Sequence, residues 1–172
     1  IPRVVTNGDE IYDNKITFAE GKKRIEIYYF PYHAALQRLI DETKKLFGKC
    51  FLIDCHSMPS IGGPMDNDKG NQRVDVVLGN KFGEARSPGL INFVEEYFKA
   101  LGMIVRRNQP YAGGYTTRHY GSPENSVHAL QIEINRALYM NEKSITRNAG
   151  YEGLKTKISN LLMALAEADL VL

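Results

Sequence analysis

The sequence has few of the features that would assign it to a specialised class of protein. It holds only two cysteines in 172 residues, and Cys50 and Cys55 would lie on opposite faces of one strand, so a disulfide is not expected. No apolar run approaches the roughly 20 residues of a membrane helix, and no basic segment followed by an apolar stretch marks a signal peptide. These absences predict a soluble protein of a reducing compartment, the cytoplasm.

Neither sign of charge is in excess. Twenty-two basic and twenty acidic side chains leave a formal net charge of +2, and the pair Arg106-Arg107 is too short to form a basic patch. A polyanionic partner such as nucleic acid is therefore not expected, and neither is a membrane. Nothing in the sequence determines an oligomeric state.

Repeats, low-complexity tracts and interdomain linkers are also missing. A chain of 172 residues with 43% hydrophobic and 24% charged residues has the size and composition of one globular domain. We therefore treat residues 1–172 as a single domain.

Hydrophobic periodicity predicts alternating helices and strands. Helical spacing marks residues 31–47, 88–101 and 151–172, and short apolar or alternating runs mark strands at 50–54, 74–78, 103–105 and 127–135. The run 50–54 has no polar alternation, which predicts a strand buried on both faces. Residues 1–22 are predicted to be irregular, and 57–72 and 108–126 to be loops. This order indicates an α/β domain with largely parallel strands and a site at their carboxyl ends.

His56 follows the strand predicted at 50–54, so its imidazole should emerge at that strand's carboxyl end. It is either a site residue or a histidine that caps the strand by hydrogen bonding to the loop, and position alone gives these equal weight. Asp54 could orient the ring. Cys55 fits a small buried hydrophobe better than a nucleophile. One imidazole does not make a catalytic zinc site, which takes about three protein ligands.

Glu133 shares one face of the alternating strand with Gln131. A carboxylate there either lines a polar pocket, where burial shifts its pKa and it can act as a general base, or lies on the wet face of an edge strand. The alternation alone favours the edge strand.

Three further cations and two aspartates lie in the predicted loops or directly after one of them. Arg118 and His119 follow glycines and suit a substrate carboxylate or an oxyanion, with a loop salt bridge as the equal alternative. Arg73 is a weaker anion-binding candidate. Asp66 and Asp68 do not start a calcium loop, because the required glycine and distal glutamate are not at the right offsets. His33 and His128 are interpreted as structural.

Several blocks, taken together and in order, resemble the N-formylglutamate amidohydrolase family. They are Ile53-Asp54-Cys55-His56-Ser57-Met58-Pro59, Val77-Leu78-Gly79-Asn80-Lys81-Phe82-Gly83, Asn108-Gln109-Pro110-Tyr111-Ala112-Gly113-Gly114-Tyr115, Arg118-His119-Tyr120-Gly121 and His128-Ala129-Leu130-Gln131-Ile132-Glu133-Ile134-Asn135-Arg136. Five separate blocks make a more specific match than any single motif in this chain.

The resemblance implies a zinc-carboxypeptidase-like fold, a three-layer α/β/α arrangement with a mostly parallel or mixed sheet. It implies metal-dependent hydrolysis of N-formyl-L-glutamate to formate and L-glutamate in histidine catabolism, with zinc as the cofactor. His56 would be a metal ligand, and Glu133 would act on the attacking water. Arg118, Arg73 and Asn108 would be substrate-binding candidates, together with His119 from the same block.

The chain opens Ile1-Pro2-Arg3 without an initiator methionine. The family's earlier segment, with a further histidine and an acidic partner for the metal, has no counterpart in it. The resemblance thus implies the carboxyl-terminal two-thirds of the family domain, with the remaining zinc ligands upstream of Ile1. Two other functions stay open: a noncatalytic or truncated carboxylate-binding module, and an amidohydrolase of another N-acyl amino acid.

Overall fold

A mixed sheet of four strands forms the centre of the computed structural model, which describes residues 2–5, 8–84, 88–168 and 170. The order is β1-β4-β2-β3. β1 pairs parallel with β4, β2 pairs parallel with β3, and β2 runs antiparallel to β4. The bounds are β1 Cys50–Met58, β2 Val76–Gly79, β3 Val105–Arg107 and β4 Val127–Asn135.

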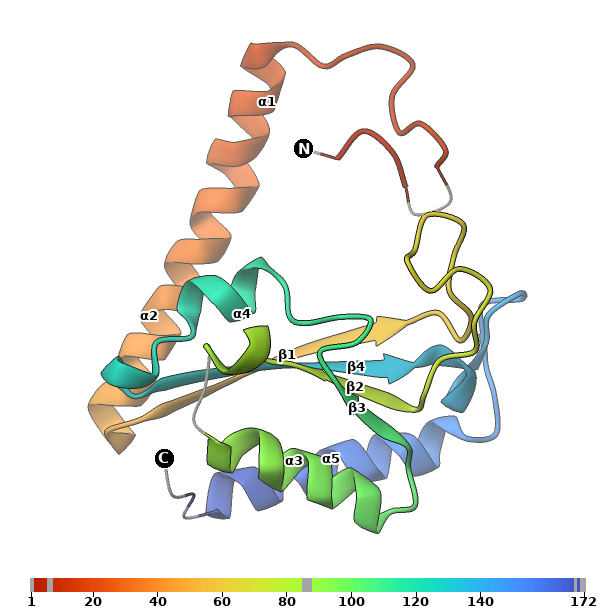
Figure 1. The fold of residues 1–172 in the computed structure, drawn as a ribbon. Coiled ribbons are helices and arrows are strands. Elements are labelled where there is room, and N and C mark those ends of the chain that lie inside the picture. Colours follow the sequence, from red (N-terminus) through yellow and green to blue (C-terminus); the bar gives the residue numbers. More distant parts are fainter. Residues whose placement is uncertain (1, 6–7, 85–87, 169, 171–172) are drawn as a thin grey trace.

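Helices cover both faces of this sheet (Figure 1). The helices α3 (Pro88–Ala100) and α5 (Tyr151–Glu167) lie on one face, and α4 (Tyr115–Tyr120) lies on the other with the end of α2 (Phe30–Phe47). The helix α1 (Phe18–Arg24) continues through a π-helical turn at Ile25–Tyr29 into α2, so one long helix rises away from the sheet. A small hairpin of β5 (Met140–Asn141) and β6 (Thr146–Arg147) precedes α5. The predicted three-layer α/β/α arrangement with a mixed sheet is confirmed.

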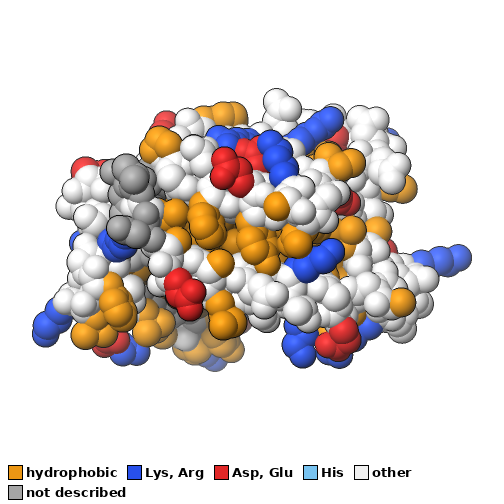
Figure 2. All heavy atoms as spheres, turned by 90° about the horizontal axis from the view of Figure 1, so that it is seen from below, with side chains coloured by type: hydrophobic (Ala, Val, Ile, Leu, Met, Phe, Trp, Pro, Cys, Tyr) orange, Lys and Arg blue, Asp and Glu red, His pale blue; other side chains and the backbone are white. Residues whose placement is uncertain are grey.

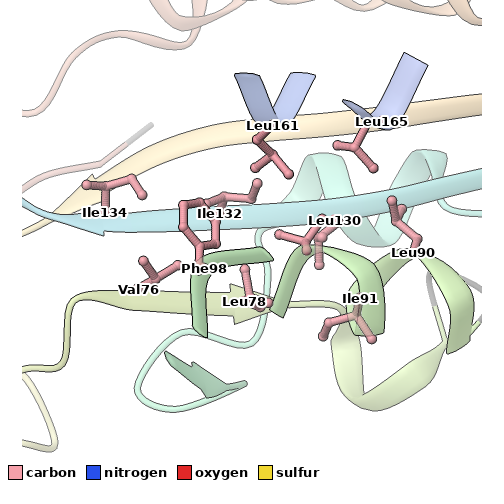
Figure 3. Packing of buried hydrophobic residues seen from close by; sticks show 11 residues of the cluster. Val76, Leu78, Leu90, Ile91, Phe98, Leu130, Ile132, Ile134, Leu161 and Leu165 are labelled. Atoms are coloured by element: carbon pink, nitrogen blue, oxygen red, sulfur yellow. The ribbon is translucent and has the colours of Figure 1, made fainter. Parts of the chain in front are cut away.

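The main hydrophobic core fills the space between the sheet and the helices α3 and α5 (Figure 3). Alternate residues of β4 point into it, and α3 and α5 contribute the opposite wall. Its fully buried members include Val76, Leu78, Leu90, Phe98, Leu130 and Leu161. The outer surface of this layer still shows a band of hydrophobic side chains (Figure 2). Leu162 and Met163 of α5 are exposed.

Most predicted elements are present with small shifts. The strand 127–135 has the predicted bounds, and α2 ends where expected because Gly48 takes the left-handed conformation (φ 73°) that stops a helix. The helix predicted over 151–172 is observed to Glu167, and residues 169, 171 and 172 of that prediction lie outside the described residues. The irregular segment predicted over 1–22 is wrong for residues 18–22, which are helical.

The prediction that residues 50–54 form a strand buried on both faces is wrong. β1 extends to Met58 and lies at an edge of the sheet, and most of its residues are only half-buried or are exposed. β4 is one of the two inner strands, between β1 and β2, and all nine of its residues are buried. An apolar run predicts a strand whose two faces are covered by helices. It does not predict whether the strand lies at an edge or inside the sheet, because that position depends on pairing with segments far away in the chain.

Among the helices that the structure describes, none combines the length and the hydropathy that crossing a bilayer requires.

Candidate functional site

Two neighbouring strands bring four polar side chains to one face of the sheet. In the parallel pairing of β1 with β4, Asp54 lies opposite Gln131 and His56 lies opposite Glu133. Since alternate residues of a strand share a face, all four point away from the main core, toward the side of α4. These four side chains form a polar patch near the carboxyl ends of β1 and β4.

Glu133 is the buried member of this patch, with 5% of its surface exposed. Its Oε1 accepts a hydrogen bond of 2.5 Å from the Gln131 Nε2 and lies 3.7 Å from the His56 Nδ1. Burial raises the pKa of Glu133, and the hydrogen bond from Gln131 and the nearby His56 act in the opposite direction. The interpretation of Glu133 as a residue on a wet edge strand is wrong, because β4 is flanked by β1 and β2.

His56 lies between two carboxylates. Its Nε2 is 3.1 Å from the Asp54 Oδ1, its Nδ1 faces Glu133, and half of the side chain (49%) is exposed. It lies within β1 rather than after it. Cys55 projects to the opposite face and is exposed, which corrects the expectation of a buried hydrophobe.

The fit of a zinc ion can be judged from these donors. Both ring nitrogens of His56 face protein carboxylates. No group of three or more His, Cys, Asp or Glu side chains suited to a metal occurs in the described part of the chain. Because catalytic zinc takes about three protein ligands, the described residues alone do not fit the ion.

The helix α4 carries the two cationic candidates. Arg118 is exposed, and its guanidinium forms neither a hydrogen bond nor an ion pair with any described residue. The His119 ring stacks on Tyr115, with centroids 4.9 Å apart. Tyr120 at the end of α4 and His33 of α2 share a hydrogen bond of 2.5 Å between the hydroxyl and the Nδ1. Arg118 is therefore a cation available for a ligand carboxylate, while His119 belongs to an aromatic cluster.

The other two substrate-binding candidates already have protein partners. Arg73 is buried, with its Nε and Nη2 donating to Asp68 and its Nη2 also donating to Asp66, each at 2.7 Å, and its Nη1 donates to the Tyr111 hydroxyl at 2.9 Å. Asn108 exchanges two hydrogen bonds with Asn80. Arg73 uses its guanidinium donors and Asn108 uses one N–H of its amide in these bonds, so the structure favours loop-holding roles, and substrate binding by either residue stays a prediction.

The sequence does not predict the structural role of Gln131. The sequence predicts that it shares a strand face with Glu133, and in the structure its amide also accepts a hydrogen bond from the Gly114 backbone N–H at 2.6 Å. Gly114 is the N-cap residue of α4. The spacing Gln-x-Glu was a usable signal for the contact with Glu133, whereas nothing in the sequence pointed to the contact with Gly114.

The comparisons with known proteins agree with one another. A family model described as N-formylglutamate amidohydrolase matches residues 1–140. An N-formylglutamate deformylase of Pseudomonas putida is 33% identical over 124 residues, which are 72% of this chain and 45% of that protein. One of Pseudomonas aeruginosa is 29% identical over 145 residues, covering 79% of this chain and 53% of that protein.

Solved structures extend this agreement to the fold. The crystal structure of an N-formylglutamate amidohydrolase from Ralstonia eutropha JMP134 superposes with a TM-score of 0.82 at 37% identity, and the match covers 92% of this chain and 57% of that one. A gene product of Agrobacterium tumefaciens matches with a TM-score of 0.66 at 20% identity over 96% of this chain and 63% of that one, which shows a common fold. The chain spans about half the length of the curated relatives that it matches.

Proposed function

The chain belongs to the N-formylglutamate amidohydrolase family, and we propose that it hydrolyses the formyl amide of N-formyl-L-glutamate to formate and L-glutamate. The names of its relatives support the substrate, since both curated proteins are N-formylglutamate deformylases. The single observation that carries the chemistry is Glu133, a buried carboxylate on a polar face of the sheet, 3.7 Å from an imidazole.

Glu133 acts as the general base and then as the general acid. It takes a proton from water as the water oxygen adds to the formyl carbon, and it gives that proton to the nitrogen of glutamate as the C–N bond breaks. Burial supports both steps, because a raised pKa lets the carboxyl group hold the proton between them. Both carboxylates of the substrate need counter-charges, and Arg118 is the available cation on α4.

Zinc at His56 is a second part of the proposal. An imidazole on a sheet face beside a carboxylate is a common ligand arrangement, yet the described residues bring together too few ligands to hold the ion alone. The steps assigned to Glu133 and Arg118 therefore use only groups that the structure describes.

The test is release of formate from N-formyl-L-glutamate by the purified protein and by its Glu133→Gln variant. We expect the variant to lose about 10²- to 10⁴-fold in turnover, the usual contribution of a general acid–base group. The exposed Glu152 of α5 supplies the matched control, Glu152→Gln, which should match the wild type.

Other outcomes identify the alternatives. Undiminished turnover by Glu133→Gln contradicts the role of Glu133. Glutamate binding without formate release by the wild type identifies a noncatalytic carboxylate-binding module. Faster release of a different acid from a panel of N-acyl amino acids reassigns the substrate.

A further inference from the structure

The side-chain amide of Gln131 connects two parts of the site that are far apart in the sequence. Its Oε1 accepts from the Gly114 N–H at 2.6 Å, and its Nε2 donates to the Glu133 Oε1 at 2.5 Å. The backbone N–H can only donate, which fixes the amide's orientation and directs its NH₂ group to the carboxylate. Gln131 is buried, with 4% of its surface exposed, so water does not compete freely for either bond.

Beside Gln131, the backbone of the segment 112–114 comes so close to β2 that β2 needs a glycine there. Gly79 of β2 pairs with Gln131 across the sheet. A Cβ at Gly79 would lie 2.4 Å from the Gly113 N, so the segment 112–114 crosses directly over this point of the sheet. Thr117 of α4 packs against Gly113 and is fully buried. The start of α4 thus packs on β2 and β4, and Gln131 makes a polar contact in this interface.

We propose that Gln131 is a positioning residue that makes the Glu133 carboxylate and the start of α4 one coupled unit. The inference rests on the proposed function, in which Glu133 acts on water and α4 presents Arg118 to a substrate carboxylate. The Gly114 carbonyl accepts a hydrogen bond from the Arg118 N–H at 3.3 Å, so the chain of contacts runs from Glu133 through Gln131 and Gly114 to Arg118. A ligand that shifts α4 thereby shifts the hydrogen bond that orients the general base.

Amide hydrogen exchange at Gly114 tests the coupling in a double-mutant cycle that needs no catalysis. Glu133→Ala removes the acceptor of the Gln131 amide, and we expect Gly114 to exchange about fivefold faster, as for a partly weakened hydrogen bond. In a Gln131→Met background, Gly114 exchanges fast already, and adding Glu133→Ala changes its rate less than twofold. Gln37→Met, the same replacement on the exposed face of α2, leaves Gly114 unchanged.

Equal effects of Glu133→Ala in both backgrounds would overturn the proposal, since the coupling would then bypass Gln131. No effect of Glu133→Ala in the wild-type background would overturn it as well.

The variant Gln131→Glu separates the two bonds. It keeps an acceptor for the Gly114 N–H and replaces the amide donor by a second buried carboxyl group, which has to share a proton with Glu133 instead of orienting it through an N–H. We expect Gly114 to stay protected while kcat for formylglutamate falls more than tenfold and KM stays within twofold. Faster exchange at Gly114, or a change confined to KM, contradicts the positioning role.

Failure of the proposed function is recognised separately. A protein that shows the exchange coupling but releases no formate keeps the Gln131 contact network and refutes the hydrolase proposal. A protein that releases formate without the coupling keeps the hydrolase proposal and refutes the role of Gln131.

Discussion

At the scale of single residues, the site combines groups that interact with one another and one that does not. The His56 ring lies 3.1 Å from the Asp54 carboxylate and 3.7 Å from the Glu133 carboxylate, whereas Arg118 is exposed and its guanidinium has no partner among the described side chains. A solvated guanidinium binds a carboxylate without first breaking a protein contact, so Arg118 is suited to substrate recognition.

Replacing Arg118 by alanine should therefore weaken substrate binding more than it slows chemistry. We expect KM for N-formyl-L-glutamate to rise about tenfold or more, as for the loss of a charged hydrogen bond of 1.5–3 kcal/mol, with kcat changed much less. Steady-state formate release measures both constants. Arg38→Ala on the exposed face of α2 is the control, and an unchanged KM for Arg118→Ala would exclude the contact.

The Arg73–Asp68 pair predicts a pH dependence of stability. Hydrogen bonds from the buried Arg73 guanidinium hold the pKa of Asp68 below its ordinary value. A depressed folded-state pKa means that the unfolded chain binds more protons, so the pair stabilises the fold above the unfolded-state pKa of about 3.9 and this contribution is lost as the pH falls through the lower folded value.

The variant Asp68→Asn should therefore be less stable than the wild type by about 1–3 kcal/mol at pH 7, and the gap should begin to narrow below about pH 4 and shrink further as the pH falls. Urea unfolding across this pH range checks both parts. Asp41→Asn on the exposed surface of α2 should show no such gap, and a gap for Asp68→Asn that is the same at pH 7 and at pH 2.5 would rule out the pair as its cause.

Sequence reasoning reached the residues of the site unevenly. His56 could be proposed because it follows an apolar run, Glu133 because it shares one face of an alternating strand with Gln131, and both because they lie in blocks that resemble a known family. Their facing positions could not, since the register of β1 on β4 joins segments that lie far apart in the chain. The hydrogen-bond partners of Arg73 and Asn108 could not be predicted either, because the conformation of the loops determines which side chains meet.

At the scale of elements, the crossing of the segment 112–114 over β2 decides where α4 lies. Gly79 permits the crossing, and Lys81 strengthens it through a backbone hydrogen bond of 2.7 Å to the Ala112 carbonyl. The sequence identified 108–126 as a long functional loop but did not predict α4 within it, because six residues are too few for a clear helical period.

Replacing Gly79 by alanine should therefore destabilise the protein by about 1–3 kcal/mol, the usual cost of forcing atoms into a packed site, and should expose α4 to faster hydrogen exchange. The neighbouring atoms belong to the backbone, so no side chain can rotate away. Gly153→Ala in α5 is the matched control, because a Cβ there meets nothing within 4 Å and alanine favours helix. Equal thermal unfolding midpoints for the wild type and the Gly79→Ala variant would contradict this prediction, because they would mean that the segment 112–114 moves aside without cost.

At the scale of the whole molecule, the layers were predictable and the strand order was not. Alternating helical and strand patterns are sufficient for an α/β sandwich, and the match to the Ralstonia eutropha structure confirms the class. The edge position of β1 and the antiparallel step between β2 and β4 depend on pairings between distant segments, which no local pattern specifies.

The metal proposal is tested on the intact 172-residue chain. Because His56 is the single imidazole in the polar patch, we expect zinc titration to show weak binding that His56→Ala weakens further, whereas replacing the buried His128 on the other face should have no effect on binding. Isothermal titration calorimetry measures the affinity and the stoichiometry. Tight binding of one ion per chain would mean that this chain supplies a complete set of ligands.

The in-register pairing of β1 with β4 also limits how the chain can change in length during evolution. Because side chains alternate between the faces, losing one residue within Val127–Ile132 would turn Glu133 into the apolar layer and bring Ile132 or Ile134 to the face of His56. Insertions and deletions that preserve the chemistry are thereby confined to the connections outside these two strands, such as 59–75 and 136–150. There, adding or removing one residue does not move the site side chains to the other face of the sheet.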